Sequence, residues 1–261
     1  MRILIHGGFF SESSQSNETK LLKQKALLDI LEKSKVYLKN NNAVSTSIFA
    51  TSLLEDNPLF NAGLGSQIQQ DGKIRMSAAI MDGTSHKFSG VINIENVQNP
   101  IFVAQKLMLE DDRVLGGEGA TKYASKEGFP IFSTETKERK IEYLTKKGNL
   151  GTGTVGCVVL DQNGKLAAAT STGGKGFEIP GRVSDSATIA GNYANEHCAV
   201  SCTGVGEDIV SGGLATKIVT RVTDGYALKD AFKKTFEELK PYDGFAGAIA
   251  VSKNGDVFFS E

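Results

Sequence analysis

One segment says most about how this 261-residue chain folds: Gly151-Thr152-Gly153-Thr154-Val155-Gly156-Cys157-Val158-Val159-Leu160. From Thr154 onward it is rich in β-branched and apolar residues, which favour a buried strand. A hairpin-turn signal follows at Asp161-Gln162-Asn163-Gly164, and residues 166–170 supply a partner strand. The sequence therefore predicts a hairpin whose first strand begins at Thr154, directly behind a glycine-rich segment.

The same glycines satisfy G-x-G-x-x-G, the dinucleotide-binding fingerprint, from Gly151 to Gly156. That site requires a strand before the glycines and a helix after them, so that the pyrophosphate meets a helix N-terminus. Here polar, helix-like residues 139–147 precede the glycines and a strand follows them. Nucleotide binding stays an alternative, which predicts stabilisation by the cofactor and no self-cleavage.

Thr154 has two interpretations of its own. A threonine hydroxyl is a poor nucleophile unless a base removes its proton. Cleavage of the Gly153–Thr154 bond would place an α-amino group, with a pKa near 7.7–8.0, on the same residue as the hydroxyl. Glycine before the bond admits backbone geometries that a Cβ would forbid. The hexapeptide alone, however, favours the simpler interpretation, in which Thr154 is a strand residue with high β propensity.

Strands and helices come in separate runs on both sides of the hairpin, which suits an α+β protein or a layered αββα protein better than strict βαβ alternation. The predicted strands cover residues 2–5, 66–70, 73–81, 90–94, 198–203, 247–252 and 257–259. The predicted helices cover residues 19–40, a segment that opens at Pro100, 118–127, 134–147, and two helices between 207 and 239. The polar stretch 135–149 is the candidate for an exposed, cleavable linker.

Composition narrows the class of protein. With 29 basic and 30 acidic residues and no basic block, the chain lacks the charge pattern of a nucleic-acid-binding protein. No apolar run approaches the length of a membrane span, and residues 1–5 are too short for a signal peptide. An odd, sparse set of cysteines (Cys157, Cys198 and Cys202) predicts reduced thiols and a cytoplasmic location. The three histidines have no ligand-type spacing, so no metal centre is expected.

Several longer motifs occur in one order along the chain. They include Asn57-Pro58-Leu59-Phe60-Asn61-Ala62-Gly63-Leu64-Gly65, Met81-Asp82-Gly83, Gly117-Glu118-Gly119-Ala120, the segment beginning at Thr154, Thr170-Ser171-Thr172-Gly173-Gly174, Pro180-Gly181-Arg182-Val183-Ser184-Asp185-Ser186, Tyr193-Ala194-Asn195 and Ser201-Cys202-Thr203-Gly204-Val205-Gly206-Glu207. Together they resemble the plant-type asparaginase / isoaspartyl peptidase family of N-terminal-nucleophile (Ntn) hydrolases. The resemblance covers nearly the whole chain. It implies a single domain with a four-layer αββα sandwich, cleaved into residues 1–153 and 154–261.

The resemblance also implies how the reaction proceeds. Thr154 is the nucleophile, freed by cleavage after Gly153, and Thr172 lies close to it and tunes it. Thr203 and Gly204 supply the oxyanion hole. A glycine at 204 permits the close backbone approach that an oxyanion-binding amide needs.

Recognition of the substrate is implied in the same way. Arg182 binds the α-carboxylate, Asp185 accepts from the α-ammonium, and Gly206 lines the substrate pocket. Asn61 belongs to a loop that supports the site. A guanidinium suits a carboxylate because its donors form a planar fork, although Arg182 and Asp185 taken alone would also fit a surface ion pair. No cofactor is required; the family allows a structural alkali-metal ion and a dimer of the cleaved units.

The chain departs from the family pattern near its N-terminus and in one strand. His6-Gly7-Gly8-Phe9-Phe10 stands where the family usually has His-Gly-Gly-Ala-Gly, and Ser77 stands where an acidic residue is common. These departures concern the substrate range rather than the type of reaction. The sequence does not rank L-asparagine against β-aspartyl dipeptides. A glycosylasparaginase-like hydrolase and an unprocessed, inactive binding module also stay open as interpretations of the sequence.

Overall fold

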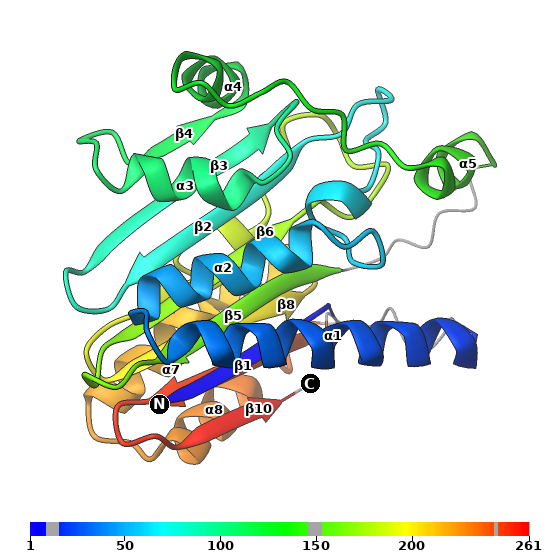
Figure 1. Ribbon diagram of the computed structural model, residues 1–261. Coiled ribbons are helices and arrows are strands. Elements are labelled where there is room, and N and C mark those ends of the chain that lie inside the picture. Colours follow the sequence, from blue (N-terminus) through cyan, green and yellow to red (C-terminus); the bar gives the residue numbers. More distant parts are fainter. Residues whose placement is uncertain (9–15, 146–152, 243–244, 261) are drawn as a thin grey trace.

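The structure is a computed structural model that describes residues 1–8, 16–145, 153–242 and 245–260. Its strands form two sheets (Figure 1). The six-stranded sheet has the order β1 (Arg2–His6), β5 (Thr154–Leu160), β6 (Leu166–Thr172), β2 (Met76–Asp82), β3 (Lys87–Ile94), β4 (Val114–Gly116). The four-stranded sheet has the order β10 (Val257–Ser260), β9 (Ala246–Ser252), β8 (Cys198–Gly204), β7 (Asn192–Ala194). The chain therefore has a mixed α+β fold.

Helices pack against both sheets. They are α1 (Asn17–Leu38), α2 (Ala43–Glu55), α3 (Pro100–Leu107), α4 (Gly117–Lys126), α5 (Lys137–Thr145), α6 (Gly206–Gly212), α7 (Leu214–Thr223) and α8 (Leu228–Glu237), with 3-10 turns η1 (Gly63–Gly65) and η2 (Asp185–Ala187). α2 and α3 pack on the six-stranded sheet, and α1 lies along α2 and β1 (Figure 1). α7 packs on β8 and against α8.

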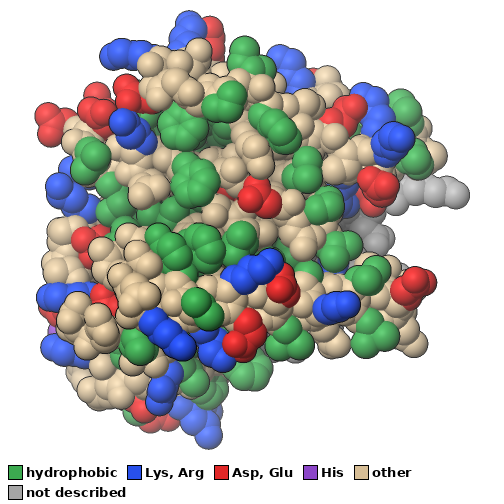
Figure 2. Space-filling model, in the orientation of Figure 1, with side chains coloured by type: hydrophobic (Ala, Val, Ile, Leu, Met, Phe, Trp, Pro, Cys, Tyr) green, Lys and Arg blue, Asp and Glu red, His purple; other side chains and the backbone are tan. Residues whose placement is uncertain are grey.

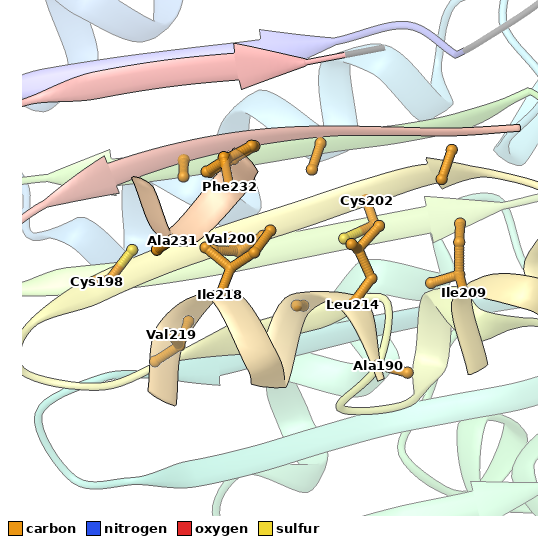
Figure 3. Close-up of a cluster of buried hydrophobic side chains, with 14 of the residues drawn as sticks. Ala190, Cys198, Val200, Cys202, Ile209, Leu214, Ile218, Val219, Ala231 and Phe232 are labelled. Carbon is orange, nitrogen blue, oxygen red and sulfur yellow. The ribbon is translucent and has the colours of Figure 1, made fainter. Parts of the chain in front are cut away.

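Apolar side chains fill the space between the two sheets and the space beneath α7 and α8. Met81, Val158 and Ala168 of the larger sheet meet Ala199 and Val251 of the smaller sheet in one buried cluster. Figure 3 shows the second cluster, in which side chains of α7 and α8 meet those of β8. Apolar packing thus joins the two sheets to each other and joins α7 and α8 to the smaller sheet.

The hairpin predicted at the glycine-rich segment is confirmed. β5 and β6 pair antiparallel, and all fourteen of their residues are buried. The register places Thr154 opposite Thr172, so the first residue of β5 and the last residue of β6 are neighbours. Burial on both faces explains why the two strands are apolar or small rather than alternating.

Two predicted elements were wrong. Residues 66–70 do not form a strand, because their backbone bonds to a loop: the N–H groups of Gln67 and Gln70 donate to the carbonyls of Gly173 and Glu178. Residues 207–239 contain three helices rather than two. Gly213 has a φ of 60°, the left-handed conformation that ends a helix, and it separates α6 from α7.

Candidate active site

A cavity of about 240 Å³ opens at the beginning of β5. Its walls come from the end of β6 and the loop after it, from η2 and the residues before it, and from the junction of β8 with α6. The lining residues are Gly153, Thr154, Thr172, Gly174, Lys175, Arg182, Ser184, Asp185, Gly204, Val205, Gly206 and Glu207. Seven of the nine residues predicted for the site therefore line one cavity, although they span more than fifty positions of sequence.

Thr154 and Thr172 are both buried in the floor of this cavity, with 6% and 4% of their surface exposed. The Thr154 hydroxyl lies 3.2 Å from the Ser186 hydroxyl on η2. The Thr172 hydroxyl accepts from the backbone N–H of Gly174 at 3.2 Å. Sequence reasoning gave Ser186 no role; its position directly after Asp185 was the available signal.

Arg182 is paired with an acidic residue that sequence reasoning did not single out. Its Nε and Nη2 donate to the two carboxylate oxygens of Glu207, at 2.8 and 3.0 Å. Lys175 Nζ donates to the same carboxylate at 3.1 Å. Hydrogen bonding from Arg182 lowers the pKa of Glu207 to about 2, so Glu207 is ionised and holds the guanidinium at the edge of the cavity.

Asp185 does not form the surface ion pair that was its alternative interpretation. Its side chain is buried, and Oδ2 has no hydrogen-bond partner among the residues that the structure describes. Burial raises the pKa of Asp185 to about 7, while the positive charge of Arg182 acts in the opposite direction. A β-carbon at Gly206 would lie 2.8 Å from both Arg182 Nη2 and Asp185 Oδ1, so the two charges converge on one glycine.

Gly204 and Thr203 lie at the end of β8. Gly204 has a φ of 136°, and a β-carbon there would lie 2.3 Å from the Phe245 carbonyl oxygen, so only glycine fits. Thr203 lines a second cavity, of about 370 Å³, together with His6 and Gly8. Its hydroxyl is buried without a hydrogen-bond partner in the described part of the chain. Thr203, whose hydroxyl has no partner in that part of the chain, thus directly precedes a glycine that lines the first cavity.

Asn61 lies outside the lining and braces it. Its Oδ1 accepts from the backbone N–H of Gln67, and its Nδ2 donates to the Gly174 carbonyl. A β-carbon on Gly153 would lie 2.8 Å from the β-carbon of Asn61. Asn61 therefore fixes the position of the loop after β6 and packs directly against the residue before Thr154.

Comparison with known proteins shows the family to which a chain with this cavity belongs. The sequence profile of the family described as Asparaginase matches residues 1–261. The chain belongs to the asparaginase family. It is 43% identical to an "Isoaspartyl peptidase/L-asparaginase" of Nostoc sp., over 98% of this chain and 87% of that relative. It is 40% identical to a protein of the same name from Synechocystis sp. (98% and 83% covered) and 36% identical to a "Plant-type L-asparaginase" of Pyrococcus furiosus (99% and 92% covered).

Membership of the asparaginase family fits the failure of the dinucleotide interpretation. Thr154–Leu160 is a strand, so the glycines are not followed by the helix N-terminus that a pyrophosphate needs. The space beside Gly156 is filled as well, because a β-carbon there would lie 2.0 Å from Ser201 Oγ and 2.5 Å from His6 Nε2. Gly151 and Thr152 lie outside the described residues.

The departures from the asparaginase family pattern have different outcomes. Phe9 and Phe10 lie outside the described residues. Ser77 accepts from the backbone N–H of Asn93 at 3.1 Å, and Asn93 Nδ2 donates to the Arg182 carbonyl at 3.0 Å. Ser77 is thus linked through one residue to the arginine of the cavity.

Two further features concern metals and membranes. Within the described residues, no group of three His, Cys, Asp or Glu side chains is arranged to hold a metal ion. Among those same residues, no helix has both the length and the apolar character needed to cross a bilayer.

Proposed function

We propose that this chain is an amidohydrolase that releases aspartate from L-asparagine, from β-aspartyl dipeptides, or from both, with Thr154 as its nucleophile. One observation carries the proposal: a threonine hydroxyl, a guanidinium and a buried carboxyl line the same small cavity, and within the described parts of the chain that carboxyl has an oxygen without a partner. A cation and an anion at this spacing suit the carboxylate and ammonium of an amino-acid head group. The names of the relatives, isoaspartyl peptidase and L-asparaginase, support the same substrates.

In the proposed reaction, cleavage of the Gly153–Thr154 bond first frees the α-amine of Thr154. That amine takes the hydroxyl proton as Oγ1 attacks the side-chain amide carbonyl of the substrate. The backbone N–H of Gly204 and the Thr203 hydroxyl stabilise the oxyanion. The leaving amine takes the proton, and water then hydrolyses the aspartyl ester on Thr154. Arg182 and Asp185 hold the head group, and Thr172 lies beside the nucleophile.

The same proposal includes processing of one domain into residues 1–153 and 154–261. Close packing of Asn61 against Gly153 supports it, because this contact restricts how the scissile bond is presented. The order helices, sheet, sheet, helices supports the four-layer αββα sandwich of Ntn hydrolases.

A single mass-spectrometric experiment tests the nucleophile and the processing together. Freshly purified wild type, incubated and measured intact, should give two fragments that divide between Gly153 and Thr154. The Thr154→Ala variant should stay whole and release no aspartate from L-asparagine. A whole wild type that still hydrolyses L-asparagine would disprove the free-amine mechanism, and a whole, inactive wild type would favour an inactive binding module.

The substrate range needs a panel of three amides. L-Asparagine, β-aspartyl-leucine and an asparagine-linked N-acetylglucosamine share the aspartyl head group and differ only in the leaving group. We expect turnover of the first or second. Preference for the third would support a glycosylasparaginase-like activity.

Self-association as a dimer of cleaved units is also proposed. Figure 2 shows hydrophobic side chains gathered over the middle of one face, around α2 and α3. Exposed apolar residues of α1 and α3 include Leu28 and Val36 of α1 and Phe102 of α3. Sedimentation velocity of the processed protein tests this proposal: a single-unit species at micromolar concentration would contradict it.

No cofactor enters the proposed mechanism, and a structural alkali-metal ion and a cytoplasmic location stay predictions. Such ions prefer carbonyl oxygens as ligands. Two of them, those of Pro58 and Phe60 in the loop before η1, point toward Gly65, where a β-carbon would meet both. If that loop binds an ion, melting temperature should rise in sodium or potassium chloride relative to choline chloride.

A further inference from the structure

A buried chain of polar side chains lies next to Thr154 and has no part in the mechanism above. His6 Nε2 lies 2.9 Å from the Ser201 hydroxyl, which lies 2.7 Å from the Thr170 hydroxyl. Thr170 in turn donates to Asn192 Oδ1 at 3.1 Å. These residues belong to β1, β8, β6 and β7, so the chain of contacts ties the two sheets together.

This polar chain occupies the space that a side chain at Gly156 would fill. Residues 154 and 156 of a strand point to the same face, so the His6 ring and the Ser201 hydroxyl lie on the face that carries the Thr154 side chain. Burial of this kind is costly unless the groups bond to one another. His6 Nδ1 and Asn192 Nδ2 have no hydrogen-bond partner among the described residues, so burying this network beside Thr154 costs folding free energy.

β1 does not extend as far as Thr154. The register pairs His6, the last residue of β1, with Gly156, so β5 extends two residues beyond β1 at the Thr154 end. On its other side Thr154 is paired with Thr172. Burial lowers the pKa of His6 to about 4. The ring is therefore neutral at pH 7. Its Nδ1 has no hydrogen-bond partner among the described residues, so the ring acts on Thr154 through the space it fills beneath Gly156.

We infer that His6 is a positioning residue for Thr154, and this inference rests on the proposed function. The imidazole, hydrogen-bonded to Ser201, fills the space beneath Gly156 and so fixes the end of β5 from which Thr154 projects. Once the bond to Gly153 is cut, residue 154 is held covalently only through Val155, so neighbouring groups must keep its new amine oriented toward its own hydroxyl. His6 and Ser201 supply that orientation.

Kinetics of fully processed variants test the inference. His6→Ala and Ser201→Ala should each lower kcat for L-asparagine by about 10- to 100-fold, since misplacement by about 1 Å costs that much. KM should stay within about twofold, because Arg182 and Asp185 are untouched. The acidic limb of the kcat–pH profile, which reports the amine, should shift in both variants. His6→Gln, whose side-chain amide can still hydrogen-bond to Ser201, should recover most of kcat.

A matched control separates positioning from general loss of stability. Ser34→Ala removes another buried hydroxyl, one that donates to the Ile30 carbonyl within α1, and should leave kcat and the pH profile unchanged. A processed His6→Ala or Ser201→Ala enzyme with wild-type kcat and pH profile would overturn the inference. So would a loss of activity that follows only the folded fraction, judged by melting curves and active-site titration. If His6→Ala does not fold, His6→Gln and Ser201→Ala test the same point. Activity that persists in Thr154→Ala would instead refute the proposed function, whatever His6 does.

Discussion

Recognition of the substrate ammonium should depend on pH through Asp185. This carboxyl is buried in the cavity, its Oδ2 has no partner among the described residues, and burial raises its pKa to about 7. Only the ionised form attracts an ammonium, so the sign is fixed: binding through this group weakens as pH falls through about 7. A carboxyl with an ordinary pKa would show no such loss above pH 5.

The size of the effect follows from the ionised fraction of Asp185. With a pKa of about 7, that fraction is about three quarters at pH 7.5 and about 3% at pH 5.5, a change of about 25-fold. The assay compares kcat/KM for L-asparagine with kcat/KM for succinamate, which has the same amide and carboxylate but no ammonium. Titration of the Thr154 amine affects both substrates equally, so it cancels in the ratio.

We expect the ratio of the two kcat/KM values to fall by about 25-fold between pH 7.5 and pH 5.5. In an Asp185→Asn variant the ratio should be small and should not vary with pH. A wild-type ratio that stays constant within twofold across this range would refute the reasoning. A variant ratio that falls as steeply as that of the wild type would assign the titration to another group.

Three other changes test the fold and the processing. Gly153→Ala should slow self-cleavage on a denaturing gel, because its β-carbon would meet that of Asn61 at 2.8 Å, and an unchanged rate would contradict this. Glu55 is buried with a pKa raised to about 8 by desolvation, so the folded state holds a proton that the unfolded state releases near pH 4.5. Relative to Glu55→Gln, wild type should lose about 1.4 kcal/mol of unfolding free energy per pH unit from about pH 5 to 8, and parallel urea-derived profiles would contradict this. Phe232→Ala should cost about 3–5 kcal/mol in urea unfolding, whereas Phe259→Ala, 72% exposed, should cost under about 0.5 kcal/mol; equal costs would contradict the assigned core.

Local patterns were sufficient to predict most of the regular elements. The β-prone run from Thr154, the turn at Asp161 and the small residues after Leu166 predict the central hairpin, because adjacent strands joined by a tight turn are specified by neighbouring residues. Residues 66–70 alternate as a strand would, yet they bond to the loop after β6. No local signal predicts that loop's proximity, which depends on contacts about a hundred positions away.

The candidate site divides in the same way. Sequence alone determined which residue types are present and, through ordered motifs, that Thr154, Arg182 and Asp185 belong together. Only the tertiary structure decided their electrostatics. It pairs Arg182 with Glu207, and where α6 contacts η2 it buries Asp185, whose Oδ2 has no partner among the described residues. It also brings His6 of the first strand beneath Gly156. A pKa, a cavity and an unpartnered oxygen depend on what surrounds a side chain, and in this protein the surroundings come from distant parts of the chain.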